Sequence, residues 1–291
     1  MSVRTDRPPV RTSPPPARPG AEARLRTPAR IAPSPVTRWT ILMLGAVFLG
    51  LPLVALFHFT IKGGLEGGIT FRHWAELLSG EVDAGGPLWD GISSSLVLAA
   101  VTVALMLALL LPTMILVRLR LPRWEKALEF VCLLPLTIPA VAMVVGLAPV
   151  YSVVARIFGS GSWTLAFAYV ILCLPYAYRA LQSNLSAIDV PTLSEAARTL
   201  GASWPTVLLR VLLPNLRRGV LAASFISVAV VLGEFTVASL LSRTNLQTAI
   251  VLVQKQDPYV AYIVVLLSLA LALGLLLVIG RVGAATARSN R

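Results

Sequence analysis

The chain has 291 residues, of which 56% are hydrophobic and only 13% are charged, with a net charge of +12. A soluble domain carries about 25% charged residues, so the composition excludes an ordinary soluble domain and indicates an all-α polytopic membrane protein. The positive charge alone is also typical of nucleic-acid binding. Its distribution along the chain fits membrane orientation instead, and we expect no nucleic-acid partner.

The first 37 residues are rich in proline and arginine, with three consecutive prolines at 14–16. Such a segment cannot bury enough apolar surface to offset the entropy lost on ordering. We therefore expect residues 1–37 to form a disordered cytosolic tail. Its arginines either hold it on that side of the membrane or, as the rarer alternative, bind anionic lipid headgroups.

Six apolar segments follow, and each exceeds the about 20 residues that a helix needs to cross about 30 Å of hydrocarbon. They lie at about 39–61, 92–117, 130–155, 157–178, 219–242 and 258–280. The sequence therefore predicts six transmembrane helices. In the third, Pro135 and Pro139 lie four residues apart on one face, and each removes a backbone hydrogen bond, which favours a bend there.

The connection at 62–91, between the first two segments, is the longest on its side of the membrane. Apolar residues recur in it at helical spacing, which predicts a short helix lying at the membrane interface. These residues are Phe71, Trp74, Leu77 and Leu78.

Lysine and arginine are distributed unequally among the connections. Twenty lie in the two tails and in the connections after the second and fourth segments, whereas five lie in the other three connections. Cytosolic connections of membrane proteins carry the excess of these residues. We therefore expect a multi-pass protein of the cell membrane with both termini, and the connection at 179–218, in the cytosol.

A moderately polar stretch at 191–214 carries signals for two short helices. Thr192 and Glu195 have the spacing of a capping box, in which each side chain bonds a backbone N–H of the first turn. Gly201 suits the left-handed residue that follows a helix end. Pro214 is expected to end the second helix. The stretch therefore predicts two helices that meet at Gly201.

The same stretch contains a spaced set of residues. They are Glu195, Ala196, Ala197, Leu200, Gly201, Val211, Leu213 and Pro214. The pattern of Glu-Ala-Ala, a glycine four residues later, and a β-branched residue two before Leu-Pro resembles the EAA loop of ABC-importer permeases. The resemblance implies that these residues form the coupling site, a cytosolic helix that docks on a separate ATPase subunit. An ordinary helix–turn–helix connection is the alternative.

The resemblance extends over about residues 38–280 and implies a type I permease fold. The first helix and its outer loop would occupy 38–89, the permease core 90–280 with its coupling loop at 191–214, and a cytosolic tail 281–291. The partners it implies are two ATP-binding subunits, a second permease, identical or homologous, and an extracytoplasmic substrate-binding protein, all assembled around the lipid bilayer.

Sequence motifs for bond chemistry are missing. There is no phosphate-binding loop for ATP, and neither a Gly-x-Ser-x-Gly nor a His-Glu-x-x-His motif is convincing. Cys132 and Cys173 lie in apolar runs, where buried thiols are the ordinary outcome, and His58 and His73 are isolated in the sequence. We therefore expect no catalytic residue, no cofactor and no metal ligand, and ATP hydrolysis on another chain.

Glu234 is the one acidic residue deep in a predicted span, where burying a carboxylate costs about 2.5 kcal/mol or more. It contacts either the substrate path or a neighbouring helix. The segment 233–243 around it is similar to permeases for polyamines, ferric iron, thiamine, sulfate and phosphonate. A polyamine such as spermidine or putrescine is the preferred substrate, because a carboxylate compensates a cation. The main alternative function is a secondary transporter driven by an ion gradient.

Overall fold

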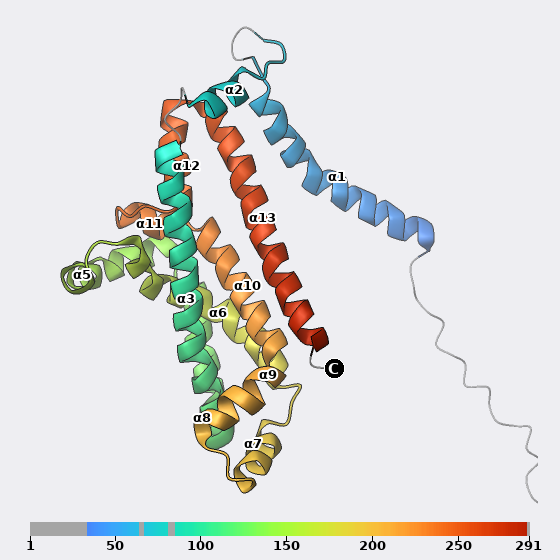
Figure 1. Cartoon of the computed structure of the whole chain (residues 1–291), viewed down its shortest axis with the longest axis vertical. Coiled ribbons are helices and arrows are strands. Elements are labelled where there is room, and N and C mark those ends of the chain that lie inside the picture. The colour runs from blue at the N-terminus through green and yellow to red at the C-terminus, as the bar shows by residue number, and fades with distance from the viewer. Residues whose placement is uncertain (1–33, 64–66, 81–84, 290–291) are drawn as a thin grey trace, which may run out of the picture. The chain divides into compact units, whose positions relative to one another are not determined.

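The computed structural model describes residues 34–63, 67–80 and 85–289, and almost all of them are helical (Figure 1). The helices are α1 (Pro35–Thr60), α2 (Arg72–Ser79), α3 (Gly85–Arg120), η2 (Pro122–Trp124), α4 (Glu125–Leu133), η3 (Leu134–Thr137), α5 (Ala140–Phe158), η4 (Ser162–Leu165), α6 (Ala166–Leu185), α7 (Val190–Thr199), α8 (Trp204–Thr206), η5 (Val207–Leu212), α9 (Leu213–Asn215), α10 (Arg217–Gly233), α11 (Thr236–Leu240), α12 (Leu246–Gln256) and α13 (Pro258–Ser289). In these ranges the only β pairing is an isolated bridge, so the all-α prediction is confirmed.

The chain divides into two units, Met1–Pro52 and Leu53–Arg291. The first unit contains most of α1, whose 25-residue segment Val36–Thr60 is long and apolar enough to cross a membrane. The predicted disordered tail falls largely on residues 1–33, which lie outside the described residues. All the sites discussed below lie in the second unit.

In the second unit, α3, α6 and α10 pack against one another, and α12 and α13 pack beside them (Figure 1). One buried cluster includes Leu98, Tyr169 and Val231, all of them no more than 1% exposed. A second cluster includes Met106 and Leu212 and lies further along α3, toward α7 and α8. Residues from helices far apart in sequence therefore form one continuous apolar bundle along α3.

Within the described residues, five helices are long and apolar enough to span a membrane, and a sixth span results if α8–α9 and α10 count as one. These two parts meet at 78°. The prediction of a polytopic helical membrane protein is confirmed. The boundaries of the third to sixth predicted helices differ from those in the structure.

The third predicted helix is interrupted. Residues 130–155 are divided among α4, the 3₁₀ turn η3 and α5, and the break lies at Ile138 and Pro139, where the backbone is extended. The bend predicted from Pro135 and Pro139 is therefore a complete end of one helix and start of another. Two prolines in one turn leave that turn without two backbone donors.

The fourth predicted helix begins too early. Ile157 still belongs to α5, which ends at Gly159 with a positive φ of 79°. The 3₁₀ turn η4 then leads into α6, which continues to Leu185, seven residues past the predicted end. The turn that separates α5 from η4 and α6 therefore lies at 159–161, a few residues after the predicted boundary at 155–157.

The fifth predicted helix, at 219–242, ends at Gly233. Residues 236–240 form the short helix α11, and α12 follows, a helix that the sequence did not predict. The sixth helix runs on as α13 to Ser289, so residues 281–289 of the predicted tail are helical. The short helix predicted in the connection at 62–91 is present as α2, in which Trp74 is partly buried and Leu78 is 84% exposed.

Candidate functional site

The helix α7 carries the first half of the EAA-like pattern, and its N-terminus is capped by Asp189. The Asp189 carboxylate accepts hydrogen bonds from the backbone N–H and the hydroxyl of Thr192, at 3.3 and 2.7 Å. These bonds lower the pKa of Asp189, because they stabilise its charged form. The predicted capping box of Thr192 and Glu195 is therefore wrong: Thr192 is the third residue of the helix and donates to the cap.

The two faces of α7 differ in exposure. Val190 and Ser194 are buried against the bundle, whereas Glu195 and Ala196 are exposed. Leu200, just past the helix end, is 89% exposed. An apolar side chain held in the open at the tip of a rigid helix is suited to a partner surface.

Gly201 ends α7 in the predicted left-handed conformation, with φ of +82°. Its N–H donates to Arg198 O at 2.9 Å, and the N–H of Ala202 donates to Ala197 O at 3.1 Å. These two bonds form a Schellman motif, which satisfies the last carbonyls of the helix. The tip of α7 is therefore a defined turn that holds Leu200 outward.

The second half of the pattern lies on the other arm of this turn. Val211 belongs to the π-helical turn η5, and Leu213 and Pro214 belong to α9. Val211 and Leu213 are partly buried and Pro214 is exposed. The second helical arm does not end at Pro214 as predicted but continues to Asn215, because a proline in the first turn of α9 needs no N–H partner.

The two arms are packed together, since α7 contacts both η5 and the end of α3. The eight residues of the pattern are thus brought to one end of the bundle. Beside them, the guanidinium groups of Arg120 and Arg198 lie over the Trp204 ring, at 5.8 and 5.2 Å from its centroid. A cleft of about 410 Å³ opens there, lined in part by Glu195. Sequence reasoning missed Trp204 and Arg120, whose meeting depends on the turn at Gly201.

Glu234 lies elsewhere, at the break between α10 and α11. Its backbone is extended, so it is not inside a spanning helix as expected. Its carboxylate accepts hydrogen bonds from the hydroxyl of Tyr169 at 2.7 Å and from the N–H of Val237 at 3.0 and 3.1 Å. The bond to Val237 begins a new turn after Gly233, which explains why the helix stops there.

A third residue completes the surroundings of Glu234. The Asn245 amide donates to the carbonyl of Glu234 at 2.7 Å and to the Tyr169 hydroxyl at 3.3 Å. The side chain of Asn245 also caps α12 in a capping box with Thr248. Tyr169 and Asn245 are fully buried, whereas Glu234 is partly exposed. Within the described residues no basic side chain forms an ion pair with Glu234, so no protein cation neutralises its negative charge directly.

Residues 101–285 match the protein family described as "binding-protein-dependent transport system inner membrane component". The chain is 29% identical to the probable ABC transporter permease protein y4fN of Sinorhizobium fredii, over 78% of this chain and 41% of that protein. It is 31% identical to the spermidine/putrescine permease protein PotC of Haemophilus influenzae, over 42% and 47% of the two chains.

A further relative is the putrescine permease protein PotI of Escherichia coli, 25% identical over 74% of this chain and 78% of that protein. The chain spans less than half the length of the y4fN and PotC proteins that it matches. The matched family region includes both α7 and Glu234.

Proposed function

Because the chain belongs to the family of binding-protein-dependent inner membrane transport components, we propose that it is the membrane-spanning permease subunit of an ATP-driven importer. It would form part of the translocation path with a second permease. Two ATP-binding subunits would dock on its cytosolic side, and an extracytoplasmic binding protein would deliver the solute. The chain itself would catalyse no reaction.

The observation that carries this proposal is the surface of α7 and its turn. Glu195, Ala196 and Leu200 are exposed, while Gly201 ends the helix in the conformation that the EAA-like pattern requires. In this proposal α7 faces the cytosol, an orientation supported by the excess of lysine and arginine in the connection at 179–218. An ATPase subunit would bind the exposed tip.

A continuous series of packed helical segments connects α7 to the bundle. α7 packs on η5, η5 continues through α9, and α10 then runs at 78° to this arm as far as Gly233. We infer that closure of the ATPase pair moves α7 and the η5 arm together and tilts α10. Such transmission requires two packings of the bundle with different affinities for the ATPase states.

The coupling role is tested by Leu200→Asp. A charged side chain at the docking tip has no effect on the bundle, because Leu200 is 89% exposed, but it opposes burial in a partner groove. We expect the variant to lose co-purification with the ATPase subunit of its transport system. Leu78→Asp is the matched control, since Leu78 is 84% exposed at the end of α2, and it should retain the ATPase. Equal recovery with both variants would refute the docking assignment.

We propose a polyamine, or another small organic cation, as the solute. The support is the carboxylate of Glu234, which forms no ion pair with a basic side chain of the described residues, together with the similarity to PotC and PotI. Permeases for ferric iron, sulfate, thiamine and phosphonate share the surrounding segment, so the charge of Glu234 is the discriminating feature. We propose that it lies beside the path, where its negative charge attracts a cation.

The test is Glu234→Gln, which keeps the acceptor for Val237 and Tyr169 but removes the charge. Spermidine or putrescine uptake should fall about tenfold, as expected for a lost interaction of about 1.4 kcal/mol with a cation. Uptake of an anion such as sulfate should rise or stay unchanged. A variant that instead loses its partner permease would assign Glu234 a structural role and remove this support for a cationic solute.

A further inference from the structure

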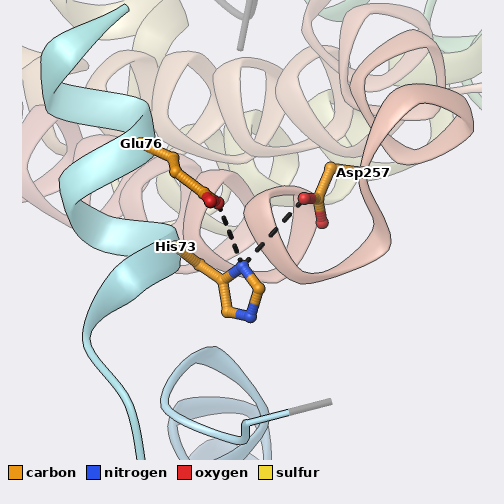
Figure 2. A group of neighbouring side chains, drawn as sticks. All are labelled: His73, Glu76 and Asp257. Atoms are coloured by element: carbon orange, nitrogen blue, oxygen red, sulfur yellow. Dashed lines mark ion pairs between the residues drawn. The ribbon is translucent and has the colours of Figure 1, made fainter. Parts of the chain in front are cut away.

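Three metal-ligating side chains from distant parts of the sequence meet at the end of the bundle opposite α7. His73 and Glu76 lie on α2, and Asp257 lies between α12 and α13 (Figure 2). The His73 Nδ1 atom is 3.3 Å from Glu76 Oε2 and 4.0 Å from Asp257 Oδ2. This group was not expected, because His73 is isolated in the sequence and no metal ligand was predicted.

The His73 ring is held with Nδ1 directed between the two carboxylates (Figure 2). It stacks on the Tyr259 ring, with centroids 4.7 Å apart and planes 10° from parallel. The Nδ1 atom is buried and has no hydrogen-bond partner among the described residues. A buried ring nitrogen left unbonded between two acids is costly unless a proton donor or a cation occupies the space between them.

The other carboxylate oxygens already have partners. Glu76 Oε1 accepts a hydrogen bond from Arg72 Nε, four residues earlier on α2. Asp257 Oδ1 caps α13 by accepting the N–H groups of Tyr259 at 2.7 Å and Val260 at 3.1 Å. Glu76 Oε2 and Asp257 Oδ2 face His73 Nδ1 (Figure 2). Each acid therefore has one oxygen engaged in local structure and one directed to a shared point.

We propose that His73, Glu76 and Asp257 form a binding site for a divalent transition metal of the zinc class. One imidazole and two carboxylates suit zinc, whereas calcium and magnesium take oxygen ligands. Ligand atoms around tetrahedral zinc lie about 3.3–3.6 Å apart, as bonds of about 2.0–2.2 Å require. The three ligand atoms already lie within 4.8 Å of one another, so small side-chain rotations close the site.

A cation in this place would connect α2 to the start of α13. α2 is joined to the end of α1 by the bond from Trp74 Nε1 to Thr60 Oγ1, at 3.2 Å. The metal would join α2 to Asp257, whose other oxygen caps α13. The side chains of His73, Glu76 and Asp257 are only 13%, 15% and 25% exposed, which leaves access for one water ligand or a group from a partner. The site therefore acts as a metal-dependent clasp between α2 and α13.

The test is zinc titration of the purified full-length chain, without a polyhistidine tag and stripped with a chelator, followed by calorimetry. We expect saturable uptake of one zinc ion per chain. His73→Phe keeps an aromatic ring on Tyr259 and removes the nitrogen, so zinc uptake should be lost. His58→Phe is the matched control, because His58 is the one other histidine and lies exposed at the end of α1; its zinc uptake should be unchanged.

The acids are tested by Glu76→Gln and Asp257→Asn, which keep the shape and, for Asp257, the oxygen that caps α13. Each should weaken zinc binding about tenfold or more, since even loss of a residue that only supports a metal ligand costs about 10–100-fold. Zinc should also raise the Tm of the wild-type chain but not of His73→Phe. No saturable uptake by the wild type, or equal uptake by wild type and His73→Phe, would overturn the proposal.

Discussion

Gly201 is the residue on which the geometry of the α7 tip depends most directly. Its φ is +82°, and a Cβ added there would meet no atom within 4 Å. The cost of Gly201→Ala is therefore one of backbone strain alone, about 1–2 kcal/mol. We expect this variant to reach the membrane, to have a lower Tm, and to import less solute for each ATP hydrolysed, because Leu200 loses its defined position.

The control for this prediction is Gly274→Ala in α13. Gly274 also has open space around its Cβ position, but its φ is not positive and it lies within a helix. Alanine is favoured over glycine in a helix by about 1 kcal/mol, so Tm should hold or rise and transport should be unaffected. If Gly201→Ala transported solute as efficiently as Gly274→Ala, the turn would have no part in coupling.

For single residues, the backbone conformation was easier to predict from the sequence than the hydrogen-bond partners of the side chains. Gly201 was identified because only glycine enters the left-handed region at little cost. The cap of α7 was misassigned because Thr192 and Glu195 also fit a capping pattern, and Asp189 lies three residues earlier. Pro191 was the available signal: a proline is favoured in the first helical turn, which requires the helix to begin before Thr192.

Helix packing depends on Gly91, where α3 meets α12. A Cβ on residue 91 would lie 2.5 Å from the Cβ of Ala249 and 3.1 Å from Asn245 O. Gly91→Ala must therefore push α12 away from α3, a form of overpacking that costs about 1–3 kcal/mol. We expect a lower Tm in detergent. Because Asn245 holds the Glu234 backbone, we also expect slower uptake.

A second substitution tests whether the lower Tm of Gly91→Ala is caused by close packing of α3 on α12. Ala249→Gly removes the nearest atom, so the double variant Gly91→Ala/Ala249→Gly should recover part of the Tm lost by Gly91→Ala alone. The remaining approach to Asn245 O prevents full recovery. Simple additivity of the two single-variant effects would mean that α3 and α12 are not in the close contact described.

Long apolar runs were sufficient to predict the spanning helices, but not where they break. Pro135 and Pro139 indicated one break, because a proline has no backbone N–H to donate to the helix. The break at Glu234 and the start of α12 have no such local signal. Both depend on Asn245, whose amide reaches Glu234 and Tyr169, and on Ser95, whose hydroxyl accepts the N–H of Leu246 at 2.8 Å. Such partners are distant in sequence, and the fold alone brings them together.

Across the whole molecule, the two candidate sites lie at different depths of one bundle. The coupling surface is built on the second buried cluster, which contains Val190 and Leu212, while the Glu234 network belongs to the first, which contains Tyr169. α10 connects them, running from Arg217 near η5 to Gly233 beside Glu234. A rigid tilt of α10 would therefore change both sites at once, which is what the proposed coupling of ATP hydrolysis to solute access requires.

The orientation of this bundle in the membrane is predicted by the distribution of lysine and arginine. Ser79, the last residue of α2, and Ser203, directly before α8, are both exposed. The helices α2 and α8 lie near opposite ends of α3 (Figure 1). The excess of lysine and arginine near Ser203 predicts that it is cytosolic and that Ser79 is outside. In intact cells, a membrane-impermeant maleimide should label Ser79→Cys, whereas Ser203→Cys should react only after permeabilisation.

The native thiols give little background in this measurement, because Cys132 and Cys173 are both buried. Labelling of Ser203→Cys in intact cells would put α7 on the side without ATP, where no ATPase subunit docks, and the coupling proposal would fall. Labelling of both positions from the same side would also contradict a membrane crossing by α3. This helix runs from the end near α2 to Arg120, whose guanidinium lies over Trp204. A single crossing by α3 requires Ser79 and Ser203 to face opposite compartments, whichever of them is outside.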